Sequence, residues 1–219
     1  MTGQRSLFEE LRGAAPATLE LRPGAVVLRG FARAGASALL EELDGVCAAA
    51  PFRHMETPGG LRMSVAMTNC GTLGWISDRR GYRYAREDPL SGQPWPVMPP
   101  AFRSLASRAA TAGGYPRFVP DACLVNRYAP GARLTPHQDK NEPDLDQPIV
   151  SVSLGLPAVF QFGGPRRTQP LVRILLEHGD TVVWGGASRH CYHGVLPLQD
   201  GEHPVTGQRR INLTFRRAG

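Results

Sequence analysis

The chain has 219 residues, of which 42% are hydrophobic and 20% charged. This balance excludes an intrinsically disordered protein and suffices for one domain, residues 1–219, with a sizeable core. The net charge is +6 and the isoelectric point about 9.6, and of the 25 basic residues only Lys140 is lysine. Such arginine-rich composition favours an anionic partner such as nucleic acid, because the planar guanidinium pairs well with phosphates and carboxylates.

Residues 1–24 are mostly polar and contain several glycines and prolines. We expect them to form an extension that lies over the surface, with at most a short turn at 7–11, before a first strand at 25–28. The first residues lack the apolar core of a signal peptide, and no window of the chain approaches the ~18 apolar residues of a membrane span. We therefore expect a cytoplasmic protein.

Two helices are predicted. The first covers 36–49, where four apolar residues recur at helical spacing, and Pro51 ends it. The second covers 101–112, because Pro99 and Pro100 precede it and Gly113 and Gly114 follow it. The apolar residues of the first helix are Leu39, Leu40, Leu43 and Val46.

Residues 52–98 contain four large aromatic residues among many glycines and prolines, with little periodicity beyond a short hairpin around 63–67. A long, partly irregular segment inside a compact domain is usually a lid or a binding loop. The alternative is a surface excursion without a function, which the aromatic residues disfavour. These residues are Trp75, Tyr82, Tyr84 and Trp95.

From residue 121 onward the chain consists of short β-rich runs separated by turn residues. Their regular spacing, without intervening helices, indicates an antiparallel double-sheet barrel rather than βαβ units. The predicted fold class is therefore α+β, mainly β: a jelly roll core at about 121–217 that the helices buttress. The predicted strands are 122–128, 149–154, 158–162, 172–177, 181–184, 190–196 and 209–216.

A candidate metal site begins with His137 and Asp139, which project to the same side of an extended segment and can reach one ion. A third ligand must come from another strand. His193 is the natural candidate, and two histidines with one carboxylate form the facial triad of iron(II) oxygenases, which leaves open positions on the metal. His178 and His190 compete for this place, but His178 occupies a predicted hairpin turn and His190, three residues before His193, points to the opposite strand face.

The last predicted strand alternates polar and apolar residues, so one of its faces is polar. An ordinary edge strand with its polar face in solvent would show the same pattern. If the polar face lines the barrel instead, Arg210 and Arg216 form a site for a dianion, because arginine binds carboxylates bidentately. Asn126 and Tyr128 offer an amide and a phenol that can hold carboxylate oxygens.

Several motifs together resemble the AlkB family of nucleic-acid repair dioxygenases over nearly the whole chain from about residue 25. They are NRYAPGARLTPHQDK from Asn126 to Lys140, YHG at Tyr192, RINLTFR from Arg210 to Arg216, PGG at Pro58, MSVAMTNCG from Met63, GW at Gly74 and SVSLGLP from Ser151.

The resemblance implies that His137, Asp139 and His193 bind iron(II), the catalytic centre, and that 2-oxoglutarate and O2 are cosubstrates. Four further residues implied to bind 2-oxoglutarate, besides Arg210, are Asn126, Tyr128, Asn212 and Arg216. The implied reaction is oxidative dealkylation of bases such as 1-methyladenine and 3-methylcytosine in single- or double-stranded DNA or in RNA. It releases an aldehyde, succinate and CO2. A double-stranded β-helix with a nucleotide-recognition lid is the implied fold.

An enzyme of this kind flips the damaged base out of the stack or works on single strands. The resemblance makes Trp75 and His137 the platforms on either side of the base, although Trp75 as an ordinary core residue is the alternative. It makes Tyr82 and the segment from Thr57 to Met67, with Met63, contacts to the strand that carries the lesion. It also brings Arg167, otherwise an exposed turn residue, near the base or its phosphate.

Two positions depart from the family pattern. Asn141 stands where the family usually has an acid, and Leu61 replaces an aromatic residue. Because an amide carries no charge to compensate a cationic base, Asn141 predicts altered lesion preference. Two other functions remain: a dioxygenase that acts on protein or a small molecule, and a non-catalytic metal-bearing single-strand binder. A monomer is expected.

Overall fold

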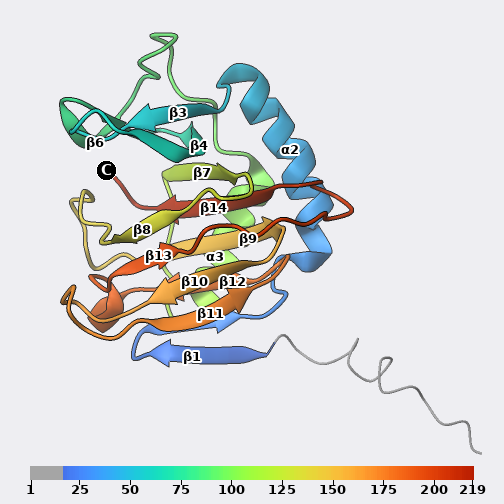
Figure 1. Ribbon diagram of the computed structural model, residues 1–219, viewed down its shortest axis with the longest axis vertical. Helices are drawn as coiled ribbons and strands as arrows, with labels where there is room; N and C mark the ends of the chain where they lie inside the picture. The colour runs from blue at the N-terminus through green and yellow to red at the C-terminus, as the bar shows by residue number, and fades with distance from the viewer. Residues whose placement is uncertain (1–16) are drawn as a thin grey trace, which may run out of the picture.

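The structure, a computed structural model, describes residues 17–219 (Figure 1). Two antiparallel sheets face each other, as the predicted jelly roll requires. The larger sheet has the order β1-β2-β12-β9-β14-β7-β4-β3 and the smaller β11-β10-β13-β8, while β5 and β6 pair separately. No helix within residues 17–219 is long and apolar enough to cross a membrane.

The strand bounds place each sequence segment in these sheets. The larger sheet contains β1 (Thr18–Arg22), β2 (Ala25–Leu28), β3 (Arg53–Glu56), β4 (Arg62–Gly71), β7 (Ala122–Tyr128), β9 (Ile149–Gly155), β12 (Thr181–Trp184) and β14 (Arg210–Arg216). The smaller contains β8 (Leu134–His137), β10 (Ala158–Phe162), β11 (Val172–Leu176) and β13 (His193–Val195), and the separate hairpin consists of β5 (Gly74–Asp78) and β6 (Gly81–Ala85).

The two main helices, α2 (Ala36–Ala49) and α3 (Pro100–Ala112), pack against the outer face of the larger sheet (Figure 1). Their buried residues meet the outward-pointing residues of β7, β9 and β14, and Phe102 contacts Phe215 edge-on with ring centroids 6.0 Å apart. Each large apolar side chain buried in this way contributes about 1.5–3 kcal/mol. The predicted buttressing role is therefore confirmed, and it leaves the inner face of the sheet free to build a site.

The predicted bounds of α2 and of the strands β2, β7, β10 and β12 agree with the structure. The second helix begins one residue earlier than predicted, at Pro100, because proline fits the first helical position, where its missing N–H is not needed.

The N-terminal prediction needs a correction, because residues 1–24 are not all an extension. Residues Thr18–Arg22 form β1 and pair with β2 in the register Thr18↔Leu28. The free edge of β2 supplies the hydrogen-bond partners, which local composition does not reveal. The predicted turn at 7–11 lies outside the described residues.

The segment 52–98 is also more regular than predicted. It contains four strands, and two of them extend the larger sheet, because β4 pairs with β7 from Ala66↔Arg127 to Gly71↔Ala122. The predicted hairpin at 63–67 is therefore part of one long strand. The separate hairpin β5–β6 turns at Gly81, where φ is 113°, a conformation that favours glycine.

Two further differences lie near the predicted metal site. Leu134–His137 forms β8, and the strand predicted at 190–196 is shorter, because β13 begins only at His193. A short 3₁₀ helix (Gly186–Ser188) and a turn occupy the residues before it. His190 therefore lies in a turn and not in a strand, so strand parity does not determine which way its side chain points.

Candidate metal centre and its cavity

The smaller sheet brings His137 and His193 side by side. His137 ends β8 and His193 begins β13, and the two residues are partners in the antiparallel register. Their ring centroids are 4.5 Å apart. Gly194 permits this close pairing, because a Cβ there would lie 2.7 Å from the carbonyl oxygen of Leu134.

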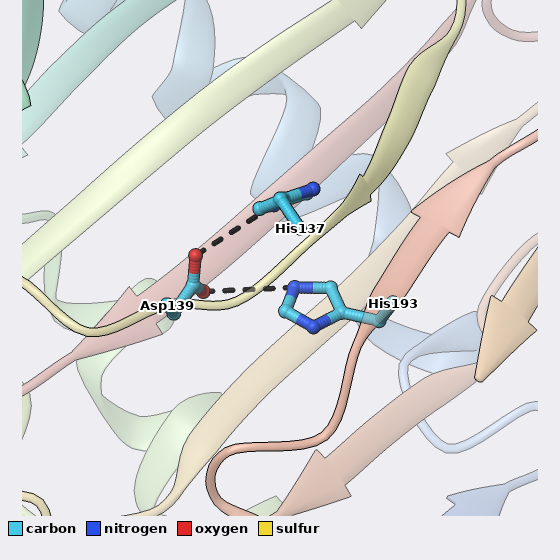
Figure 2. A group of neighbouring side chains, drawn as sticks. All are labelled: His137, Asp139 and His193. Carbon is cyan, nitrogen blue, oxygen red and sulfur yellow. Dashed lines mark ion pairs between the residues drawn. The ribbon is translucent and has the colours of Figure 1, made fainter. Parts of the chain in front are cut away.

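Asp139 follows β8 and turns its carboxylate toward both rings (Figure 2). Its Oδ1 is 3.7 Å from Nε2 of His137 and its Oδ2 is 3.8 Å from Nε2 of His193. Ligand atoms of the three residues all lie within 4.8 Å of one another, and they form the one such cluster of potential metal ligands found within residues 17–219. The structure therefore brings together the triad that the sequence predicted, and neither His178 nor His190 joins it.

Backbone carbonyls orient both histidines. Nδ1 of His137 is 2.9 Å from the oxygen of Thr135, and Nδ1 of His193 is 3.0 Å from that of Cys191. A carbonyl oxygen only accepts, so each Nδ1 carries the proton and each Nε2 keeps its lone pair for a metal. Burial, together with nearby His137, lowers the pKa of His193 to about 4. His193 is therefore neutral, as a ligand must be, at physiological pH.

Arg216 holds the carboxylate of Asp139. Its Nε and Nη2 donate to Oδ2 of Asp139 over 3.0 and 2.5 Å. Burial alone would raise the pKa of Asp139, but Arg216 and the two histidines outweigh it and hold the pKa well below its ordinary value. The carboxylate is thus ionised and oriented, with Oδ1 directed toward His137.

The inner face of β14 lines the cavity beside the triad. This strand lies between β9 and β7 in the middle of the larger sheet, and all seven of its residues are buried. The edge-strand alternative is therefore wrong. The cavity has a volume of about 530 Å³ and is lined by Asn126, Tyr128, Arg210, Asn212 and Arg216 besides the triad.

Arg210 is a buried cation that pairs with no acidic side chain in the part of the chain that the structure describes. It is 1% exposed, and its Nη2 donates to Oγ of Ser153 over 3.0 Å. Within residues 17–219 its Nε and Nη1 have no hydrogen-bond partner. Its guanidinium lies 4.9 Å from the ring centroid of Tyr128, and burial lowers the pKa of Arg210.

A buried, unpaired guanidinium is costly, and a carboxylate would satisfy the unpaired nitrogens of Arg210. A dicarboxylate such as 2-oxoglutarate fits this requirement, since its second carboxylate would then reach toward the triad along the same cavity. Asn126 offers a further unpaired buried oxygen, Oδ1. Asn212 lines the cavity, but its amide nitrogen already donates to Ser151 and to the backbone of Val152. Its side chain therefore helps to hold β14 against β9 in the larger sheet.

The outer part of the cavity contains most of the residues predicted to contact a base. Thr57, Met63, Trp75, Tyr82 and Asn141 all line it. Trp75 is half-buried and stacks on Tyr82, with ring centroids 5.6 Å apart and an interplanar angle of 14°. The side chain of His137 is 39% exposed. A flat aromatic surface and an exposed imidazole thus face one cavity, and Trp75 also packs against the hydrophobic core.

Arg167 is the predicted contact that the cavity does not include. It is exposed, and its guanidinium lies 5.9 Å from the ring centroid of Tyr192. Arg62, which belongs to the predicted contact segment from Thr57 to Met67, also lines the cavity. Sequence reasoning missed Arg133, a further lining residue, and also Glu142 and Arg189, which form a buried ion pair of 2.9 Å beside the triad. The available signal for Arg133 was its basic side chain inside the motif from Asn126 to Lys140. The ion pair leaves no pattern in the sequence.

Residues 24–216 match the model of the 2OG-Fe(II) oxygenase superfamily. The chain is 63% identical over 204 residues to the alpha-ketoglutarate-dependent dioxygenase AlkB of Salmonella typhimurium, covering 93% of this chain and 94% of that protein. It is 62% identical to AlkB of Escherichia coli, covering 91% and 92%. The solved structure of OsALKBH1 superposes with a TM-score of 0.78 at 26% identity and covers 92% of this chain and 100% of that chain.

Proposed function

Because this chain belongs to the AlkB family within the 2OG-Fe(II) oxygenase superfamily, we propose that His137, Asp139 and His193 hold the iron(II) it uses. The protein is an iron(II)- and 2-oxoglutarate-dependent dioxygenase that dealkylates nucleic-acid bases. We propose that its main substrate is DNA carrying N-alkylated bases such as 1-methyladenine and 3-methylcytosine, that RNA is a second substrate, and that it works as a cytoplasmic monomer.

The observation that carries the proposal is the unpaired cation of Arg210 in the same cavity as the triad. When bound, iron(II) with 2-oxoglutarate and O2 supplies the oxidising chemistry: the keto acid loses CO2 to give succinate, and the hydroxylated alkyl group leaves the base as an aldehyde. Arg210 would bind the distal carboxylate, and Arg216 would keep the Asp139 carboxylate ionised and directed at the metal.

The remaining residues would hold the base. We propose that the segment 52–98 is the nucleotide-recognition lid over the core at 121–217, and that a flipped base lies between Trp75 and His137. Stacking on an aromatic side chain contributes about 1 to 3 kcal/mol per base, which offsets much of the cost of unstacking. Arg62 and Arg133 line the cavity and would meet a phosphate backbone that runs past it, which favours nucleic acid over a protein or a small-molecule substrate. We propose that the exposed Arg167 also contacts the base or its phosphate.

The test uses mass spectrometry on methylated oligonucleotides incubated with anaerobically purified enzyme, iron(II), 2-oxoglutarate and O2. We expect each methyl group to be lost with the wild type and retained with His137→Ala. Equal loss with both enzymes would refute the metal assignment. Succinate release measured with alkylated and unmodified oligonucleotides tests the substrate: equal release would favour a protein or small-molecule substrate, and a tight DNA shift without turnover would favour a binding protein.

A further inference from the structure

A buried carboxylate, Glu142, lies between the metal site and the hairpin β5–β6. Its side chain is 2% exposed, and its Oε1 is 3.4 Å from Nε of Arg216, the residue that also holds Asp139. The same Oε1 accepts a 2.5 Å hydrogen bond from the hydroxyl of Tyr84 on β6. Oε1 of Glu142 therefore contacts both Arg216, which binds Asp139, and Tyr84, which belongs to the hairpin.

Arg189 fixes Glu142 and the loop that contains it. Its Nη2 donates to Oε2 of Glu142 over 2.9 Å and its Nη1 to the backbone oxygen of Asp139 over 2.7 Å. Its Nε donates to the backbone oxygen of Gln147 over 3.0 Å. Both side chains of this ion pair are 2% exposed, so solvent does not screen it. The loop from Asp139 to Gln147 is thus held from within, and Glu142 has little freedom to follow a moving hairpin.

The hairpin contains the aromatic surface of the proposed base site. Trp75 on β5 is the register partner of Tyr84 on β6, and Trp75 stacks on Tyr82. Within residues 17–219, the hydrogen bond from Tyr84 to Glu142 is the one that joins this hairpin to the loop from Asp139 to Gln147. Glu142 itself is not among the residues that line the cavity, so its contacts are structural links and not contacts to a base.

We propose that Glu142 and Tyr84 are positioning residues that couple order at the metal ligand Asp139 to order in the base-binding hairpin, through Arg216. Arg216 shares its donors between two carboxylates, Asp139 and Glu142. A dication at the triad would lower the negative charge that Asp139 presents to Arg216. The attraction between Arg216 and Glu142 would then become stronger. Loading the metal site would then hold the Glu142 carboxylate in place, and this carboxylate accepts the hydrogen bond from the Tyr84 hydroxyl. This inference rests on the proposed metal site.

The test is hydrogen exchange of hairpin residues 74–85 in wild type and Tyr84→Phe, with and without Mn(II) and 2-oxoglutarate, which bind without turnover. Loading should slow exchange in the wild type by up to about 10-fold, because it strengthens a hydrogen bond that the ligand-free protein already makes and a hydrogen bond to a charged group contributes at least that factor in full. In Tyr84→Phe the exchange should be fast and insensitive to loading. The matched control is Tyr82→Phe, which removes a hydroxyl from the same strand without touching Glu142 and should respond as the wild type does.

Coupling is reciprocal. Tyr84→Phe should therefore weaken the binding of Mn(II) with 2-oxoglutarate, followed by electron paramagnetic resonance, by the same factor by which loading slows hairpin exchange in the wild type. A Tyr84→Phe hairpin that responds to loading as the wild type does would overturn the inference, as would a wild-type hairpin indifferent to loading. With either of these hairpin results, the proposed function still stands if the wild type binds Mn(II) and repairs methylated oligonucleotides. Failure of Mn(II) to bind the wild type would overturn both.

Discussion

Replacing Arg210 with methionine should make the ligand-free protein more stable and 2-oxoglutarate binding much weaker. Within the described part of the chain two of its guanidinium nitrogens are buried without partners, and each such group costs about 1–3 kcal/mol. Methionine removes this cost and forfeits the hydrogen bond to Ser153, worth about 1.5–3 kcal/mol because its donor is charged, and some packing. We expect a net gain of about 0.5–3 kcal/mol and a rise in Tm of about 2–4 °C per kcal/mol.

The same substitution removes two charge-assisted hydrogen bonds to the distal carboxylate, each worth about 1.5–3 kcal/mol, so affinity for 2-oxoglutarate should fall by about 10²- to 10⁴-fold. Thermal unfolding with Mn(II) measures both effects, since the ligand raises Tm only where it binds the folded protein. Arg173→Met, at an exposed position on β11, is the matched control and should change neither quantity. A clear loss of ligand-free stability in Arg210→Met, or an undiminished Tm rise with 2-oxoglutarate, would refute the reasoning.

Three further predictions concern the metal and the base. Trp75→Ala should lower kcat/KM for a methylated oligonucleotide by about 5- to 150-fold, since stacking contributes about 1 to 3 kcal/mol; an equal loss of 2-oxoglutarate affinity would show that the effect is not stacking. Chelation with EDTA should abolish dealkylation, and added iron(II) should restore it in the wild type but not in His193→Ala, so recovery of that variant would exclude His193 as a ligand. Asn141→Asp should raise kcat/KM for the cationic 1-methyladenine and 3-methylcytosine relative to the neutral 3-methylthymine, because a carboxylate compensates the cation. Unchanged selectivity would end this explanation.

Local signals in the sequence determine the elements that were predicted with the observed bounds. In α2 the apolar residues Leu39, Leu43 and Val46 repeat at helical spacing and all become buried, and Pro51 follows the last turn. The spacing is sufficient because a helix forms its hydrogen bonds within one segment.

The strands that the sequence did not reveal depend on distant partners. β1 exists because β2 offers a free edge, and β4 extends over ten residues because β3 and β7 both pair with it. β8 contains Pro136, which weakens any local strand signal, and it forms beside β13 because Gly194 lets the backbones approach. Such pairing depends on contacts between residues far apart in the chain, so periodicity within one window cannot show it.

The site divides in the same way. His137, Asp139 and the polar face of β14 follow spacings of two residues and could be found in the sequence. His193 lies 56 residues after His137, and strand parity could not separate it from His190, which lies in a turn. The ion pair of Glu142 and Arg189 could not be found in this way, because the two residues lie far apart in the chain and neither belongs to a periodic pattern. Arg167 was placed by resemblance alone, and the structure leaves it outside the cavity lining.

Three buried arginines differ in whether neighbouring acidic side chains compensate their charge. Arg189 and Arg216 each contact acidic side chains within residues 17–219, so their burial is compensated when the chain folds. Arg210 is as deeply buried but contacts a serine hydroxyl and an aromatic ring. Its compensation must come from a ligand, because an uncompensated buried charge destabilises the fold. The cavity therefore contains a buried charge that the described residues do not compensate, and a dicarboxylate bound there would stabilise the folded protein.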